Sequence, residues 1–218
     1  MALVDVKERQ LTIKLVYYGP PLSGKTTNLR HIHQSVAELN RGRLMTLDTK
    51  DDRTLFFDLL PIFFQRSGLS FRIKVYTVPG QPLHEATRRI VLQGADGIAF
   101  VADARRSEVR TNNEAFQNMK ANLERLGLDA YGIPVVIQYN KCDLPDTLTE
   151  DETRGMGATP GEVVFRAVAL EGTGVMETFL GLVERAWISL DGRLNFDKLF
   201  GIRREHFMSS LREHVAHG

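Results

Sequence analysis

The sequence predicts an α/β fold with a mainly parallel, doubly wound sheet and helices on both faces. Apolar runs rich in β-branched and aromatic residues alternate with segments whose apolar residues recur at helical spacing. The three later runs are apolar almost throughout, which is typical of strands covered on both faces. This alternation favours strand–helix–strand units, and therefore a parallel sheet.

Six segments have the length and composition of strands, in the order 11–18, 43–48, 71–78, 97–103, 133–139 and 163–169. Two later segments have an apolar face at helical spacing. The residues of the first face are Phe116, Met119, Leu123 and Leu126. Those of the second are Val175, Phe179, Leu182, Val183, Ala186, Trp187 and Leu190.

The last part of the chain differs from the rest. We expect residues 1–190 to form one domain and residues 191–218 to form a C-terminal extension that is partly helical or disordered. The extension is charged, but Phe207, Leu211 and Val215 would share one face of a short helix. It is predicted either to be a solvated appendage or to dock onto a partner or onto the domain's own surface.

Composition excludes several classes of protein. The chain has 218 residues and a net charge of +1, so no strong field would steer it onto nucleic acid. Its single cysteine, Cys142, cannot form an internal disulfide, which fits a reducing cytoplasm. No apolar run is long enough to span a bilayer. Ala2 stands where myristoylation needs glycine, and no prenylatable cysteine ends the chain, so we expect a soluble cytoplasmic protein without a lipid anchor.

The loop after the first strand fits the Walker A pattern, G-x-x-x-x-G-K-[ST]. A loop with glycine at both ends can turn its N–H groups inward around phosphate oxygens, and the following helix adds its positive N-terminal dipole. Lys25 would lie between the β- and γ-phosphates, and the Thr26 hydroxyl would be a ligand of Mg²⁺. The predicted nucleotide contacts here are Gly19, Pro20, Pro21, Leu22, Ser23, Gly24, Lys25, Thr26 and Thr27.

A second motif, N-K-x-D at residues 140–143, follows the strand 133–139. The ionised Asp143 can only accept hydrogen bonds, and guanine offers it two donors where adenine offers neither. The Asn140 amide can hold the imidazole edge of the base, and the Lys141 stem can lie along its plane. The N–H of Ala169 could meet the guanine oxygen, or this segment could be an ordinary strand end. Together with the Walker A loop, the motif predicts a P-loop NTPase G domain that binds GTP and GDP.

Several blocks of the sequence resemble the MglA family of bacterial Ras-like GTPases, which govern cell polarity and gliding motility. The resemblance is continuous from about residue 11 to about residue 190, and the blocks 52–58, D-R-T-L-F-F-D, and 76–81, Y-T-V-P-G-Q, are its most specific parts. Further matching blocks are 17–20, Y-Y-G-P, 24–29, G-K-T-T-N-L, and 137–141, I-Q-Y-N-K.

The resemblance implies roles for residues in the segments that follow the P-loop helix. Thr54 is expected to bind Mg²⁺ and the γ-phosphate, Gly80 to donate its N–H to the γ-phosphate, and Gln81 to orient the attacking water. Arg53 corresponds to an arginine finger supplied within the chain; from the residues alone it could also be a solvated loop residue that pairs with a nearby aspartate. The family further implies slow intrinsic hydrolysis, stimulated by MglB, a roadblock-domain dimer, and polarity or motility effectors recruited at a cell pole.

Two residues depart from the pattern of Ras-like proteins. Thr77 replaces the aspartate that reaches Mg²⁺ through a water, so metal binding would need another carboxylate, for which Asp48 and Asp58 are candidates. Pro21 stands where a small glycine is usual and has no N–H to donate. These departures keep open an alternative function, a nucleotide-dependent binding module with little hydrolysis. A P-loop ATPase or small-molecule kinase is a third hypothesis, which Asp143 argues against.

Overall fold

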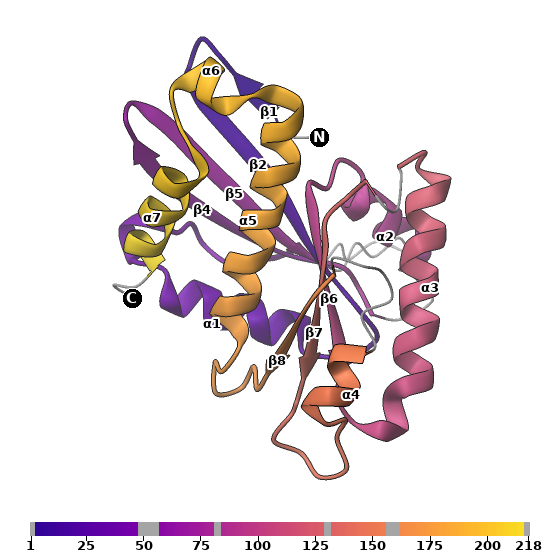
Figure 1. Ribbon diagram of the computed structural model, residues 1–218. Helices are drawn as coiled ribbons and strands as arrows, with labels where there is room; N and C mark the ends of the chain where they lie inside the picture. The colour runs from indigo at the N-terminus through magenta and orange to yellow at the C-terminus, as the bar shows by residue number, and fades with distance from the viewer. Residues whose placement is uncertain (1–2, 48–56, 81–83, 129–131, 156–161, 216–218) are drawn as a thin grey trace.

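The computed structural model describes residues 3–47, 57–80, 84–128, 132–155 and 162–215. These residues form one mixed sheet between two layers of helices (Figure 1). The sheet order is β3-β4-β5-β2-β6-β7-β8, and β1 pairs with β2. The strands are β1 (Leu3–Asp5), β2 (Gln10–Tyr18), β3 (Met45–Leu47), β4 (Phe57–Arg66), β5 (Leu69–Thr77), β6 (Gly97–Asp103), β7 (Val135–Asn140) and β8 (Val163–Ala167).

The helices lie on both faces of this sheet. They are α1 (Lys25–Ser35), α2 (Glu85–Leu92), α3 (Val109–Arg125), α4 (Glu150–Gly155), α5 (Val175–Leu194), α6 (Phe196–Phe200) and α7 (Arg204–Val215), with short 3₁₀ turns η1 (Glu38–Asn40) and η3 (Arg106–Glu108). One core lies between the sheet and α1, α5, α6 and α7. A second core lies between the sheet and α2 and α3. The predicted doubly wound α/β class is therefore confirmed.

The six predicted strands are present, with ends that differ by a few residues, as β2, β3, β5, β6, β7 and β8. The pairs β2–β5, β2–β6, β6–β7 and β7–β8 are parallel. Because the carboxyl ends of these strands meet at one edge, the loops after β2, β5, β6 and β7 lie close together. That edge carries both sequence motifs.

Strand β4 was not predicted from the sequence; it pairs antiparallel with β5 from Leu59 to Arg66. Its inward residues Leu60, Ile62 and Phe64 alternate with more exposed ones, which is the period of a half-buried strand. Pro61 hides this pattern, because proline within a run argues against a central strand. The Pro61 carbonyl accepts a hydrogen bond from the Gly42 N–H. Because the N and O atoms of one residue in an antiparallel strand point to the same side, the missing N–H of Pro61 costs no bond to β5.

The C-terminal helices pack on the domain's own surface. Helix α5 continues to Leu194, beyond the change of composition at residue 191, and α6 and α7 follow it back over the sheet (Figure 1). Phe207 is fully buried, with its ring stacked on Trp187 at a centroid distance of 4.1 Å and tilted against Phe71 at 5.0 Å. Residues 207, 211 and 215 share the buried face of α7, as the sequence predicted.

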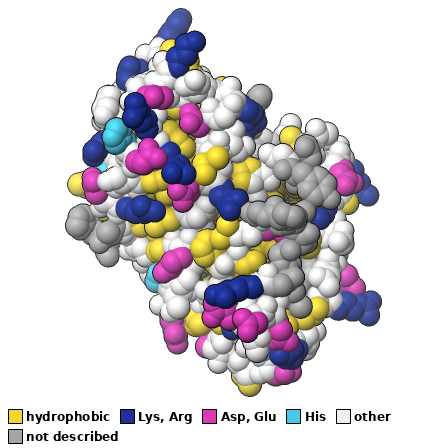
Figure 2. Space-filling view, in the orientation of Figure 1, with side chains coloured by type: hydrophobic (Ala, Val, Ile, Leu, Met, Phe, Trp, Pro, Cys, Tyr) yellow, Lys and Arg dark blue, Asp and Glu magenta, His cyan; other side chains and the backbone are white. Residues whose placement is uncertain are grey.

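The surface shows no preference for one charge on the face drawn in Figure 2, where Lys and Arg side chains are interspersed with Asp and Glu. This pattern agrees with the net charge of +1. Among the helices of the described residues, none combines the length and the apolar character that crossing a membrane requires.

Candidate functional site

The Walker A loop connects the end of β2 to the start of α1, which is the context expected for a phosphate-binding loop. Its backbone needs unusual dihedral angles: φ is 60° at Leu22 and 102° at Gly24. A Cβ atom on Gly24 would lie 2.2 Å from Nδ2 of Asn140, so only glycine fits there. The glycine of the motif is thus fixed both by conformation and by close approach to the base-reading loop.

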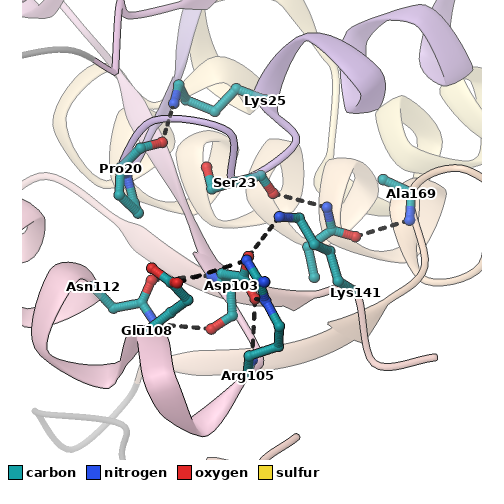
Figure 3. A network of polar contacts seen from close by, with 10 residues as sticks. Pro20, Ser23, Lys25, Asp103, Arg105, Glu108, Asn112, Lys141 and Ala169 are labelled. Carbon is teal, nitrogen blue, oxygen red and sulfur yellow. Dashed lines mark hydrogen bonds and ion pairs between the residues drawn. The ribbon is translucent and has the colours of Figure 1, made fainter. Parts of the chain in front are cut away.

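Lys25 is buried, with its residue 7% exposed. Its Nζ donates hydrogen bonds to the carbonyls of Gly19 at 3.0 Å and Pro20 at 2.6 Å (Figure 3). Burial lowers the pKa of Lys25 to about 7, with the charge of Arg88 acting in the same direction and Asp58 opposing it. The loop therefore holds an ammonium group away from water, and an anion bound there would stabilise its charge.

The loop also places Thr26 beside a buried carboxylate. The Thr26 hydroxyl donates to Asp58 Oδ2 at 2.7 Å, and the Thr77 hydroxyl donates to the same oxygen at 3.0 Å. Thr46 donates to Asp58 Oδ1 at 2.8 Å. Of the two carboxylates that the sequence left unranked, Asp58 lies against Thr77, and Asp48 lies outside the described residues.

These oxygens are the kind of donors that Mg²⁺ prefers, namely a threonine hydroxyl with a carboxylate behind it. Within the described ranges, no group of three His, Cys, Asp or Glu side chains could hold a metal ion by itself. The residues present that fit such a cation are Thr26, through its hydroxyl, and Asp58 behind it.

The segment after β5 lies directly against the Walker A loop. A Cβ atom on Gly80 would lie 2.5 Å from Cα of Pro21, so this approach requires glycine. Arg88 of α2 holds the segment by donating to the carbonyls of Pro79 at 3.0 Å and Gly80 at 2.7 Å. Its other guanidinium nitrogen reaches Oδ1 of Asn118 on α3 at 2.8 Å. Nothing in the sequence pattern singled out Arg88 for this role.

On the other side of the loop, Asn140 joins the two motifs. Its Nδ2 donates to the Ser23 carbonyl at 2.8 Å, and its Oδ1 accepts the N–H of Ala169 at 2.8 Å. Strand β8 ends at Ala167, so Ala169 belongs to the following turn. The N–H that the sequence analysis considered for the guanine oxygen is therefore hydrogen-bonded to Asn140 in this structure.

Two cavities flank the Walker A loop. The residues that line the first, of about 490 Å³, include Lys25, Thr26, Asp58 and Gly80. The other, of about 160 Å³, is lined by residues of both motifs and of the turn after β8. The residues lining both are Leu22, Gly24 and Thr27. An elongated ligand with a phosphate end and a base end would fit across this shared wall.

In the smaller cavity, Asp143 is exposed and Lys141 is partly buried. Nζ of Lys141 forms an ion pair with Oδ2 of Asp103 at 2.5 Å (Figure 3). Arg105 binds the same carboxylate through two nitrogens, at 3.0 and 2.8 Å. Asp103 was not among the residues predicted from the sequence, although a carboxylate at the end of a strand next to β7 is a signal for such a residue.

A buried hydrogen-bond network around Gln138 also supports the Walker A loop. Gln138 is fully buried on β7 and donates to Oδ1 of Asn28 and to the hydroxyl of Thr178, both at 2.9 Å. Asn28 in turn donates to the carbonyl of Gly24 at 3.0 Å. These contacts tie β7, α1 and α5 to the end of the Walker A loop. Three predicted residues, Arg53, Thr54 and Gln81, lie outside the described residues.

The fold and the site define a P-loop nucleotide-binding protein of the Ras-like type, with a Walker A loop after β2 and N-K-x-D after β7 on the same sheet edge. No protein-family model matches the chain. It is 42% identical over 179 residues to the mutual gliding-motility protein MglA of Myxococcus xanthus (strain DK1622), an alignment that covers 82% of this chain and 92% of that protein. The chain therefore belongs to the MglA family.

Proposed function

We propose that this protein is a small regulatory GTPase, which binds GTP and GDP with Mg²⁺ and hydrolyses GTP to GDP and phosphate. The observation that carries the proposal is the side chain of Asn140, which bonds both the Walker A loop at Ser23 and the base-side turn at Ala169. One residue thereby fixes the distance between a phosphate site and a base site. That arrangement suits a nucleotide, because its phosphates and its base must be bound at the same time by two different loops.

Guanine selectivity is assigned to Asp143. Its carboxylate opens into the smaller cavity, where it would accept from the ring N1–H and the exocyclic amine of guanine. The second hydrogen of the Asn140 amide remains for the imidazole edge of the base. Adenine has the same imidazole edge but would leave the Asp143 carboxylate unpaired, and a site that loses its partners in this way discriminates strongly.

At the phosphate end, we assign Lys25 and the backbone N–H groups of the Walker A loop, except at Pro20 and Pro21, which have none, to the β- and γ-phosphates. Thr26 would hold Mg²⁺ together with Thr54, and Asp58 would supply the negative charge that Thr77 lacks. When bound, Mg²⁺ neutralises the charge that develops on the phosphate oxygens. The buried Asp58 can orient the Thr26 hydroxyl because its Oδ2 accepts a hydrogen bond from that hydroxyl at 2.7 Å.

For hydrolysis, we assign Arg53 to the stabilisation of the transition-state charge and Gln81 to the attacking water. An arginine in that role contributes on the order of 10³ to 10⁵ in rate. Gly80 lies against Pro21 and lines the larger cavity, which supports the assignment of its N–H to the γ-phosphate.

The similar protein from Myxococcus xanthus supports a proposal for the role in the cell. The name of the Myxococcus xanthus protein includes gliding motility. We propose that this chain likewise switches the binding of effectors of a motility or polarity machinery. We also propose that the chain itself is recruited from the cytoplasm to a cell pole. We further propose an MglB-type roadblock-domain dimer as the activator, because slow intrinsic hydrolysis needs a partner that places Arg53 and Gln81.

Phosphate release from GTP tests the proposal. The purified chain should hydrolyse GTP slowly, and a roadblock-domain dimer of MglB type should stimulate it. Arg53→Ala and Gln81→Leu should abolish that stimulation while they leave GDP binding in place.

The same assay separates the second candidate function, a nucleotide-dependent binding module, which Thr77 and Pro21 favour. Tight guanine-nucleotide binding with no turnover, alone or with the activator, would support the module and contradict the GTPase.

A further inference from the structure

We infer that Asp103 is a positioning residue for nucleotide binding: it holds Lys141 as a fixed wall of the base pocket and keeps it away from Asp143. The inference rests on the proposed function and concerns the base end of the same site.

Lys141 follows β7 with a left-handed backbone, φ 67°, and its side chain is 25% exposed. It lines the smaller cavity with Leu22 and Leu144. A lysine on a flexible four-carbon stem would normally sample many rotamers there. Its ion pair with Asp103 at 2.5 Å fixes the far end of the stem, so the apolar part of the side chain forms a preformed surface for a base.

Neighbouring residues fix the position of Asp103 and stabilise its charged form. It is the last residue of β6, directly opposite Asn140 of β7 in the sheet register, and its side chain is 5% exposed. The side chain of Asn112 on α3 bonds both its backbone N–H, at 3.0 Å, and its carbonyl, at 2.8 Å. The backbone of Asp103 is therefore anchored on both sides of its Cα, independently of Lys141.

The Asp103 carboxylate has further donors. The Arg105 side chain reaches both oxygens and the Arg105 N–H adds a third bond at 3.1 Å (Figure 3). Burial alone would raise the pKa of Asp103, but hydrogen bonds from Arg105 and Lys141 lower it to about 2. At neutral pH the carboxylate is thus a permanent, immobile partner for the Lys141 ammonium.

The charge of Lys141 matters because Asp143 lines the same cavity. Among the described residues that line this cavity, Asp143 is the one carboxylate. A Lys141 freed from Asp103 would have Asp143 as an alternative partner, in competition with the two donors of guanine. Asp103 therefore leaves the base-reading carboxylate available and spares the ligand the cost of ordering the lysine.

The rate at which a fluorescent GDP analogue leaves the full-length protein tests this inference. Asp103→Asn, which keeps the shape but removes the charge, should speed release by about three- to tenfold, the value expected for one disordered long side chain. Glu114→Gln is the matched control, because it removes a carboxylate from an exposed ion pair with Arg110 on α3 and should leave release unchanged.

A double-mutant comparison separates positioning from a general structural effect. Lys141→Met keeps the apolar stem but loses the charge, and in that background Asp103→Asn should speed release no further. The advantage of GDP over inosine diphosphate, which lacks the exocyclic amine, should also shrink in Asp103→Asn alone. If the fold-changes in release rate of the two substitutions multiply, or if the preference for GDP over inosine diphosphate is unchanged, Asp103 does not act through Lys141 and the inference is wrong.

Arg105→Gln provides a second test should Asp103→Asn not fold, because it loosens the carboxylate without removing it. A smaller acceleration in the same direction would support the inference, and an unchanged release rate would contradict it. A wild-type chain that does not retain GDP would instead overturn the proposed function, and this inference with it.

Discussion

The buried amino group of Lys25 has a lowered pKa, so its protonation should change when an anion binds to the loop. Its pKa of about 7 lies below the ordinary value of 10.5, so the unfolded chain holds more protons than the folded one between those two pH values. The contribution of Lys25 to the stability of the nucleotide-free protein therefore rises with pH across that window. Phosphate groups would reverse the shift, because their charge favours the ammonium form.

Nucleotide binding at pH 8 should consequently take up about one proton. Calorimetry of GDP binding in buffers with different ionisation enthalpies measures this uptake. Lys25→Arg is the control, since its guanidinium is charged in both states and should remove the buffer dependence. A wild-type binding enthalpy that is the same in all buffers would show that Lys25 is already charged in the free protein.

Asp58 provides the second test at the level of single residues. It accepts hydrogen bonds from Thr26 and Thr77, so it supports the hydroxyl that we assign to Mg²⁺. Asp58→Asn should raise the Mg²⁺ concentration needed to retain GDP by about tenfold or more, as for other residues that orient a metal ligand.

Titration of Mg²⁺ against the release of fluorescent GDP gives this value. Asp197→Asn on α6, which changes an exposed carboxylate paired with Arg203, should leave the requirement as in wild type. An unchanged requirement in Asp58→Asn would mean that another carboxylate compensates for Thr77.

Among the elements, α7 makes the clearest prediction about stability. Phe207 packs on Trp187 of α5 and Phe71 of β5, and is fully buried. Phe207→Ala should lower the free energy of unfolding by about 3–5 kcal/mol. Arg212→Ala on the exposed side of the same helix should change it by less than about 0.5 kcal/mol.

Chemical denaturation of the two variants tests whether the C-terminal helices are part of the core. Equal, small losses would mean that α7 contributes no packing energy and behaves as an appendage. The expected loss in Phe207→Ala would show that folding of the domain depends on α7.

For the whole molecule, the sequence predicted the class of fold because strands and helices have different hydrophobic periods. The same approach failed where a local signal was hidden, as with Pro61 in β4. The C-terminal helices show another limit: their apolar face was legible, but the surface they cover depends on Trp187 and Phe71, which are distant in the chain.

The candidate site shows the same division. Gly24, Lys25 and Asp143 stand in motifs of fixed spacing, so they could be found from the sequence. Asp58 and Asp103 act through contacts 32 and 38 residues away in the chain, and only the pairing of strands brings them to Thr26 and Lys141. No spacing rule predicts such contacts.

The central claim is that one pocket recognises guanine through Asp143 and phosphate through the Walker A loop. Calorimetry of the nucleotide-free protein with Mg²⁺ and either GDP or ADP tests it most directly. We predict that GDP binds at least about 10⁴-fold more tightly than ADP, and that Asp143→Asn, which offers one donor and one acceptor, transfers the preference to xanthosine diphosphate. Equal affinity for GDP and ADP, or an Asp143→Asn protein that still prefers GDP, would contradict the account.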